Sequence, residues 1–94
     1  MTVRFTPQAL AELDAILDYV AERSSSGANR IQRRIKTLID LLPHFPLAGQ
    51  GTDIARLRRL VVTPFPYVIY YRTDDDDIVV VSVRHSARKA EPGR

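Results

Sequence analysis

Three β-prone runs decide the fold: RLRRLVV at residues 56–62, YVIYYRT at residues 67–73 and IVVVSVRH at residues 78–85. Valine, isoleucine and tyrosine dominate these runs, and they suit a pleated, half-buried surface. Two turn signals separate the runs, TPFP at 63–66 and four aspartates at 74–77. Aspartate suits turns because its carboxylate can bond the backbone two residues on. We therefore predict an antiparallel three-stranded meander. The nearly continuous apolar run of the last strand indicates a central position, buried on both faces.

The sequence before the meander predicts a hairpin of two helices. Thr6 and Pro7 mark a helix start, because a hydroxyl N-cap precedes a proline whose missing N–H costs nothing at the first helical position. Apolar residues then recur at helical spacing, and a second apolar series begins after the Ser/Gly break at residues 24–27 and ends before Pro43. The two series are Leu10, Leu13, Ile16, Leu17 and Val20, then Ala28, Ile31, Ile35, Leu38 and Leu42. The second series forms a narrow apolar stripe along one side of its helix, which suits packing against an antiparallel neighbouring helix.

The predicted fold is therefore α+β with the element order β-α-α-β-β-β. A short alternating run at residues 3–5 supplies the first strand, and residues 44–54 form a Pro- and Gly-rich loop that leads to the meander. The helical hairpin is the only available cover for the mainly antiparallel sheet, so it must pack on one face. We expect one domain over residues 1–94, with residues 88–94 as a flexible tail.

Composition narrows the class of protein. The chain has no cysteine, which rules out disulfides and thiolate zinc sites and favours a cytoplasmic protein. We expect no membrane span or signal peptide, because no apolar run approaches 18 residues. The net charge is +3, and only two of the 14 basic residues are lysines. Arginine suits planar, bidentate contacts with phosphate or carboxylate. His44 has no second ligand nearby, so we expect neither a metal nor a cofactor.

Four features in register resemble the RelE/ParE superfamily of bacterial toxins from type II toxin–antitoxin systems. They are FTPQALAELDAILDYVAE at residues 5–22, HFPLAGQG at 44–51, the run from LRRL to SVRH at 57–85, and Arg88. The resemblance implies a cognate ParD-like antitoxin, a toxin–antitoxin hetero-oligomer and a role in plasmid stabilisation. RelE-like members look like metal-free ribonucleases that cut mRNA in the ribosome, whereas ParE-like members trap DNA gyrase on cleaved DNA.

The segment from Pro64 to Arg88 looks more like the ParE branch. The RelE pattern would favour an arginine at the position of Tyr67 and a tyrosine in the tail, but the tail SARKAEPGR contains no aromatic residue. We therefore interpret the chain as a non-enzymatic toxin that inhibits gyrase by binding it. The residues predicted to contact partners are Arg56, Arg58, Arg59, Arg72 and Arg88. A competing interpretation of the LRRL arginines is a charged edge strand that discourages aggregation.

The alternative is a ribosome-dependent mRNA endoribonuclease. Metal-free RNA cleavage needs a base, an acid and cations aimed at the developing phosphorane charge. The alternative catalytic set is Arg58, Arg84, His85 and Arg88. Arg84 and His85 should point to opposite faces of their strand, however, and a lone histidine more often caps a strand and hydrogen-bonds locally. A third possibility is a degenerate family member that has lost toxicity.

The three tyrosines of the middle strand could stack on bases in the ribonuclease interpretation. Tyr67 and Tyr71 share one face of the strand and Tyr70 takes the other. At least one of them is therefore expected in the core.

Overall fold

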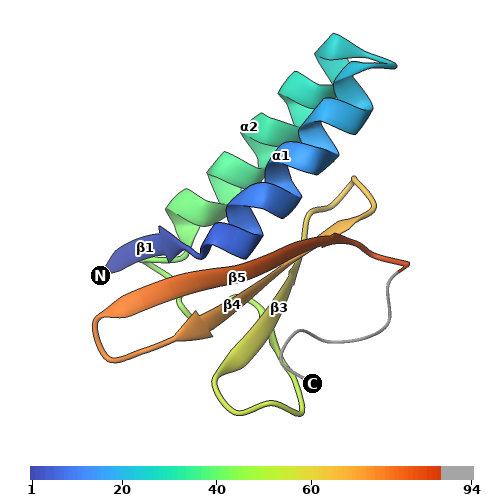
Figure 1. Ribbon diagram of the computed structural model, residues 1–94. Helices are drawn as coiled ribbons and strands as arrows, with labels where there is room; N and C mark the ends of the chain where they lie inside the picture. Colours follow the sequence, from blue (N-terminus) through green and yellow to red (C-terminus); the bar gives the residue numbers. More distant parts are fainter. Residues whose placement is uncertain (88–94) are drawn as a thin grey trace.

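Two helices lie side by side on one face of a five-stranded sheet (Figure 1). The computed structural model describes residues 1–87, so the predicted flexible tail at 88–94, including Arg88, lies outside the described residues. The elements are β1 (Thr2–Phe5), α1 (Pro7–Ala21), α2 (Ser25–Leu41), β2 (Gln50–Gly51), β3 (Leu57–Val61), β4 (Tyr67–Thr73) and β5 (Asp77–His85). The predicted α+β fold and element order are confirmed, and the predicted loop at 44–54 contains the additional short strand β2.

The strands are ordered β1-β5-β4-β3-β2, and only the β1–β5 pair is parallel. The prediction of a mainly antiparallel sheet is therefore confirmed. The predicted central position of β5 is correct for its first half only, because β1 pairs with Asp77–Val80 and stops there. The chain turns into α1 at that point, so the second half of β5 lacks a neighbouring strand on that side.

A bulge in β5 changes which residues face the helices. Tyr70 pairs with Ser82 while Tyr71 pairs with Val80, so Val81 is an extra residue in the ladder. Val80 and Val83 both lie in the core beneath the helices as a result. Ser82 and Arg84 belong to the opposite side of the strand. We call that side, directed away from α1 and α2, the helix-free face.

Both helices begin where a hydroxyl side chain caps the backbone. The Thr6 Oγ1 accepts a hydrogen bond from the Ala9 N–H at 3.1 Å, as its predicted N-cap role requires. Ser24 does the same for the Gly27 N–H at 3.0 Å, so the Ser/Gly break at residues 24–27 supplies the N-cap and the first turn of α2. The link between the helices is consequently shorter than expected.

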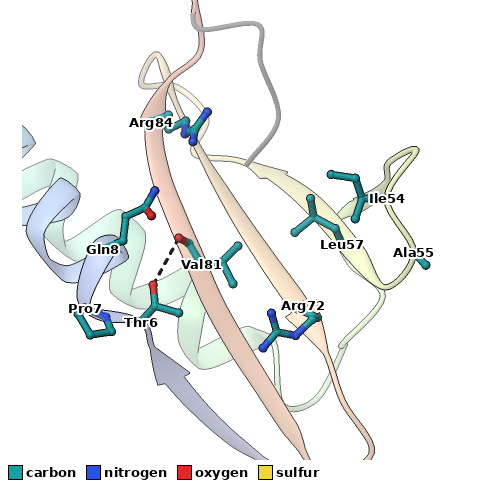
Figure 2. A pocket seen from close by; sticks show the side chains of 9 residues that line it. All are labelled: Thr6, Pro7, Gln8, Ile54, Ala55, Leu57, Arg72, Val81 and Arg84. Atoms are coloured by element: carbon teal, nitrogen blue, oxygen red, sulfur yellow. Dashed lines mark hydrogen bonds between the residues drawn. The ribbon is translucent and has the colours of Figure 1, made fainter. Parts of the chain in front are cut away.

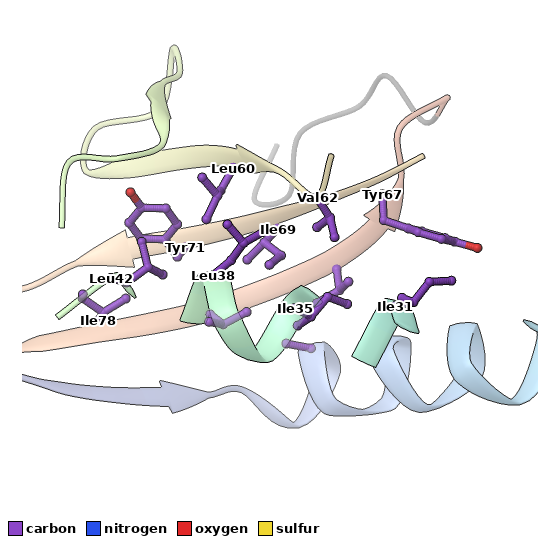
Figure 3. Close-up of a cluster of buried hydrophobic side chains, with 13 residues drawn as sticks. Ile31, Ile35, Leu38, Leu42, Leu60, Val62, Tyr67, Ile69, Tyr71 and Ile78 are labelled. Carbon is purple, nitrogen blue, oxygen red and sulfur yellow. The ribbon is translucent and has the colours of Figure 1, made fainter. Parts of the chain in front are cut away.

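The main core lies between the helical hairpin and the sheet (Figure 3). Ile31, Ile35 and Leu38 of α2 pack there against Ile69 and Tyr71 of β4. A smaller apolar cluster occupies the helix-free face. It consists of Leu57, Val68 and Tyr70, with the partly buried Ile54 and Val81 packed against it. The tyrosines thus divide between the faces as predicted, and all three belong to apolar clusters.

The helices themselves are short or polar relative to membrane segments. Within residues 1–87, neither helix has the length and apolar character needed to cross a bilayer.

Candidate functional site

The described arginines that the sequence predicts for partner contact do not form one cluster. Arg59 and Arg72 lie on the helix-free face, because Arg59 pairs with Tyr70 and Arg72 with Leu57. Arg58 lies on the other face, opposite Tyr71. Arg56 precedes β3 in a left-handed conformation with φ 65°. The structure therefore brings Arg59 and Arg72 to one surface and gives Arg58 a different environment.

Arg58 holds the segment that carries the HFPLAGQG motif. Its Nη1 donates to the Gly49 carbonyl oxygen at 2.7 Å and lies 3.4 Å from the Leu47 carbonyl oxygen. The fully buried Tyr71 adds two bonds, since its hydroxyl donates to the Pro46 carbonyl and accepts from the Gly49 N–H, both at 2.8 Å. Arg58 therefore has a structural role, and its part in partner contact remains a prediction.

The clamped segment presents large apolar side chains to solvent. Phe45 is 59% exposed and Leu47 is 65% exposed. They line a shallow hollow of about 520 Å³ together with Leu41 at the end of α2. Single exposed apolar residues are ordinary, but a fixed group of them marks a candidate contact surface.

Tyr71 also gives the protein a predicted alkaline pH dependence. Burial raises the pKa of the Tyr71 phenol above its ordinary value of 10.0, although the Gly49 hydrogen bond and the Arg58 charge oppose the shift. When the pH rises above the ordinary pKa of 10.0, the Tyr71 phenol loses its proton in the unfolded chain but keeps it in the folded chain. The stabilisation is therefore complete below the unfolded-state pKa and is lost as pH rises through the folded-state pKa. In urea unfolding from about pH 8 to 11, stability should fall more steeply for the wild type than for Tyr71→Phe; parallel profiles would contradict this prediction.

A separate cleft of about 370 Å³ opens where the helix-free face meets the start of α1 (Figure 2). Leu57 and Val81 line it from the sheet, Thr6 and Gln8 from the start of α1, and Ile54 and Ala55 from the turn before β3. Arg72 and Arg84 also line it. The sequence predicted both arginines as functional, but in different interpretations.

Arg84 is held at this cleft by residues of two elements. Its Nε donates to the Ser82 Oγ at 2.8 Å and lies 3.8 Å from the Glu12 Oε2. The Glu12 Oε1 accepts hydrogen bonds from the Ser82 Oγ at 2.7 Å and the Val83 N–H at 3.2 Å. Glu12 thus accepts hydrogen bonds from the part of β5 that does not pair with β1. The sequence analysis assigned no distinct role to Glu12, because it is one of three acidic residues of α1, together with Asp14 and Asp18.

His85 lies apart from the cleft. It pairs with Tyr67 on the side of the sheet that the helices cover, and the two rings make an edge contact with centroids 5.6 Å apart. The His85 Nδ1 accepts the Ala87 N–H at 3.1 Å. The predictions that His85 hydrogen-bonds locally and that Arg84 and His85 point to opposite faces are therefore confirmed. Arg88, the remaining member of the alternative catalytic set, is outside the described residues.

The described part of the chain contains no group of three histidine and carboxylate side chains placed to hold a metal ion.

The sequence matches the family described as the ParE toxin of the type II toxin–antitoxin system parDE, over residues 3–90. The chain belongs to the ParE toxin family. Among curated relatives, Toxin RelE2 of Caulobacter vibrioides is 44% identical over 86 residues, covering 92% of this chain and 96% of the relative. The putative toxin Y4kP of Sinorhizobium fredii is 34% identical over 84 residues, covering 89% and 86%.

Solved structures share the fold. A chain from the chromosomal ParDE toxin–antitoxin system of P. aeruginosa matches with a TM-score of 0.76 and 24% identity, covering 90% of this chain and 95% of the other. A YoeB/ParE toxin from Agrobacterium tumefaciens matches with a TM-score of 0.63 and 18% identity, covering 90% and 98%. The resemblance to the RelE/ParE superfamily that the sequence suggested is confirmed.

Proposed function

We propose that this family member inhibits DNA gyrase by binding it and does not cleave RNA. The observation that supports the proposal is the position of His85. The exposed imidazole of His85 lies against Tyr67, on the opposite face of the sheet from the cleft that Arg72 and Arg84 line. A base and its cations would have to meet at one phosphate to cut RNA without a metal.

The relatives carry names from both branches of the superfamily. Their names therefore do not distinguish gyrase from mRNA as the target. The environment of Tyr67 favours the ParE branch. This position, where the RelE pattern would favour an arginine, holds a side chain that is 7% exposed and packs in the main core. A tyrosine buried there contributes to stability and offers no cation to a phosphate.

We also propose that a ParD-like antitoxin neutralises the toxin in the cytoplasm, as a toxin–antitoxin hetero-oligomer. The structural neighbour from the P. aeruginosa ParDE system supports this partner. Arg59 and Arg72 on the helix-free face provide cationic contacts, and complementary charges accelerate and orient protein association. The fixed apolar surface at Phe45 and Leu47 offers a second type of contact.

Two parallel assays of the purified chain test the target. We expect it to inhibit gyrase supercoiling and to accumulate cleaved DNA, and to leave mRNA on translating ribosomes intact in primer extension. Ribosome-dependent cuts with unaffected gyrase would refute the gyrase proposal. Normal growth of a bacterial host that expresses the chain alone would instead indicate a degenerate, non-toxic member.

His85→Ala gives a sharper prediction within the same host assay. We expect growth arrest to be retained, because His85 makes only a local hydrogen bond and an edge contact. The control is His44→Ala, which removes the other histidine of the chain from an exposed loop position. If His85→Ala alone abolished toxicity, while circular dichroism showed an intact fold, a catalytic histidine would have to be reconsidered; loss of a general base typically costs about 10²–10⁴-fold in rate.

A further inference from the structure

The solvent side of α2 carries three arginines that lie close together. Arg30, Arg33 and Arg34 are spaced three and four residues apart, so they share one side of the helix. We propose that this α2 arginine stripe binds the phosphate backbone of duplex DNA, namely the DNA that gyrase holds while it is inhibited. The inference rests on the proposed function in one respect, that gyrase is the target.

The α2 arginine stripe points away from the core and away from α1. Ile31, on the other side of α2, packs in the main core. Gln32 lines a groove beside Leu13 of the neighbouring helix α1 (Figure 1). Arg34 lies about 200° around the helix from Gln32, and its Nε donates to the Thr63 carbonyl oxygen at 2.8 Å, in the turn after β3. The stripe is therefore open to a large partner on the side of α2 that α1 does not cover.

The positive charge of the α2 arginine stripe is not neutralised by nearby carboxylates. The sequence of α2 contains no acidic residue before Asp40, and Asp40 makes an ion pair with Lys36 at 2.9 Å. Within residues 1–87, none of the ion pairs involves an arginine of the stripe. Like charges three and four residues apart destabilise a helix. A bound polyanion would relieve this repulsion, which gives the stripe a reason to favour one.

A polar hollow of about 390 Å³ adjoins the stripe. It is lined by Asn29, Gln32, Arg33 and Lys36. Side chains of these types donate hydrogen bonds to phosphate oxygens. None of the four provides the aromatic or aliphatic anchor that protein interfaces use, or the ring on which unpaired bases stack. The backbone of a duplex, which presents phosphate and sugar groups, matches this chemistry better than a peptide or a single strand does.

The length of the stripe suits the charge density of a duplex. Between Arg30 and Arg34 the helix rises about 6 Å, at about 1.5 Å per residue. Duplex DNA carries one negative charge per about 1.7 Å of its axis, so an aligned stripe faces about three to four charges. Each arginine can then contact one phosphate. The exposed carboxylates of Asp14 and Asp18 on α1 repel the same backbone, which directs the duplex to the side of α2 away from α1.

Fluorescence anisotropy of a labelled mixed-sequence DNA duplex, at several salt concentrations, tests the inference on the full chain. Each phosphate contact contributes about 0.9 to the slope of log affinity against log salt, so three contacts predict a wild-type slope of about −2.7. Arg33→Gln should reduce the slope by about 0.9 and weaken binding about tenfold at low salt, equally on two unrelated sequences. Arg33→Lys keeps the charge and should retain most of the wild-type slope.

Arg4→Gln is the matched control. It removes one positive charge from an exposed arginine of β1 that already pairs with Asp77 at 3.0 Å, and its affinity and slope should equal those of the wild type. Circular dichroism checks that each variant is folded. In gyrase cleavage assays, Arg33→Gln should accumulate less cleaved DNA than wild type or Arg4→Gln at equal toxin concentration.

Equal affinity and slope for wild type and Arg33→Gln would overturn the inference. So would an Arg33-dependent preference for single-stranded RNA or for a poly-glutamate peptide over the duplex, since either result would identify a different partner. If Arg33→Gln accumulated as much cleaved DNA as the wild type, the stripe would be refuted while gyrase inhibition stands. Arg33-dependent duplex binding by a chain that leaves gyrase active would support DNA binding by the stripe and refute gyrase as the target.

Discussion

Gly49→Ala is expected to lower the free energy of unfolding by about 2 kcal/mol, the scale of an overpacked core position. A Cβ at this position would lie 2.8 Å from the Tyr71 Cε1, 2.9 Å from its hydroxyl oxygen and 3.1 Å from the Arg59 carbonyl oxygen. None of these neighbours can yield cheaply, because Tyr71 is fully buried and the Arg59 oxygen belongs to the sheet backbone. The gain of about 0.4–1 kcal/mol that alanine brings by restricting the unfolded chain offsets only part of the cost.

The same substitution two residues later is the control. A Cβ at Gly51 meets nothing within 4 Å, so Gly51→Ala should change stability by no more than about 0.5 kcal/mol. Denaturant unfolding monitored by circular dichroism measures both variants. Combining Gly49→Ala with Tyr71→Phe should cost less than the sum of the two single changes, because both disrupt the same hydroxyl contact. Equal stability of Gly49→Ala and Gly51→Ala would show that the Tyr71 clamp is not tight.

The hydrogen bonds of Tyr71 and Arg58 that Gly49→Ala would disturb also hold the candidate contact surface at Phe45 and Leu47. Tyr71 and Arg58 together fix the carbonyl groups of Pro46, Leu47 and Gly49. The exposed side chains of Phe45 and Leu47 therefore stand at defined positions, without the entropy cost of ordering a mobile loop on binding. The pattern HFPLAGQG can thus be explained by packing: the glycine allows close approach to a buried tyrosine.

Local sequence signals were sufficient for most of the secondary structure. Thr6 and Pro7 predicted the start of α1, and the β-prone runs predicted the meander, because both depend on interactions within a few residues. The short strand β2 was not predicted, since Gln50 and Gly51 have little strand propensity and are ordered by pairing with Arg59 and Arg58. Tertiary pairing determines such an element.

The candidate site was only partly predictable for the same reason. The alternation of side chains along a strand correctly places Arg84 and His85 on opposite faces. The bulge at Val81, however, interrupts this alternation, so residues of β5 before Val81 point to the opposite face from the one that simple alternation predicts. Sequence alone could not show that Arg72 and Arg84 line one cleft or that Arg58 turns toward a loop. In each case, residues far apart in the sequence become neighbours through the pairing of strands, which local sequence patterns do not determine.

Sequence patterns gave no indication of the hydrogen bonds that Glu12 makes to β5. These hydrogen bonds are the basis of a second prediction with a large expected effect. Glu12→Ala should lower the free energy of unfolding by about 3 kcal/mol, since it leaves buried donors without their acceptor and removes the carboxylate beside a buried guanidinium. The donors are the Ser82 hydroxyl, the Val83 N–H and, nearby, Arg84. The full cost of a wholly buried ion pair does not apply, because 20% of the Glu12 side chain remains exposed.

Asp14→Ala is the matched control for Glu12→Ala. It removes an exposed carboxylate two residues further along the same helix and should change stability by less than about 0.5 kcal/mol. Glu12→Gln keeps a carbonyl oxygen for the Val83 N–H and should fall between the two. Hydrogen exchange supplies a local readout: the Val83 amide should exchange faster in Glu12→Ala than in Asp14→Ala, even under conditions where both are fully folded. Similar Val83 exchange in the two variants would mean that a neighbouring group, and not Glu12, protects this edge of β5. Protection that depends on Glu12 would instead establish that one carboxylate takes the place of the strand that ends at Phe5.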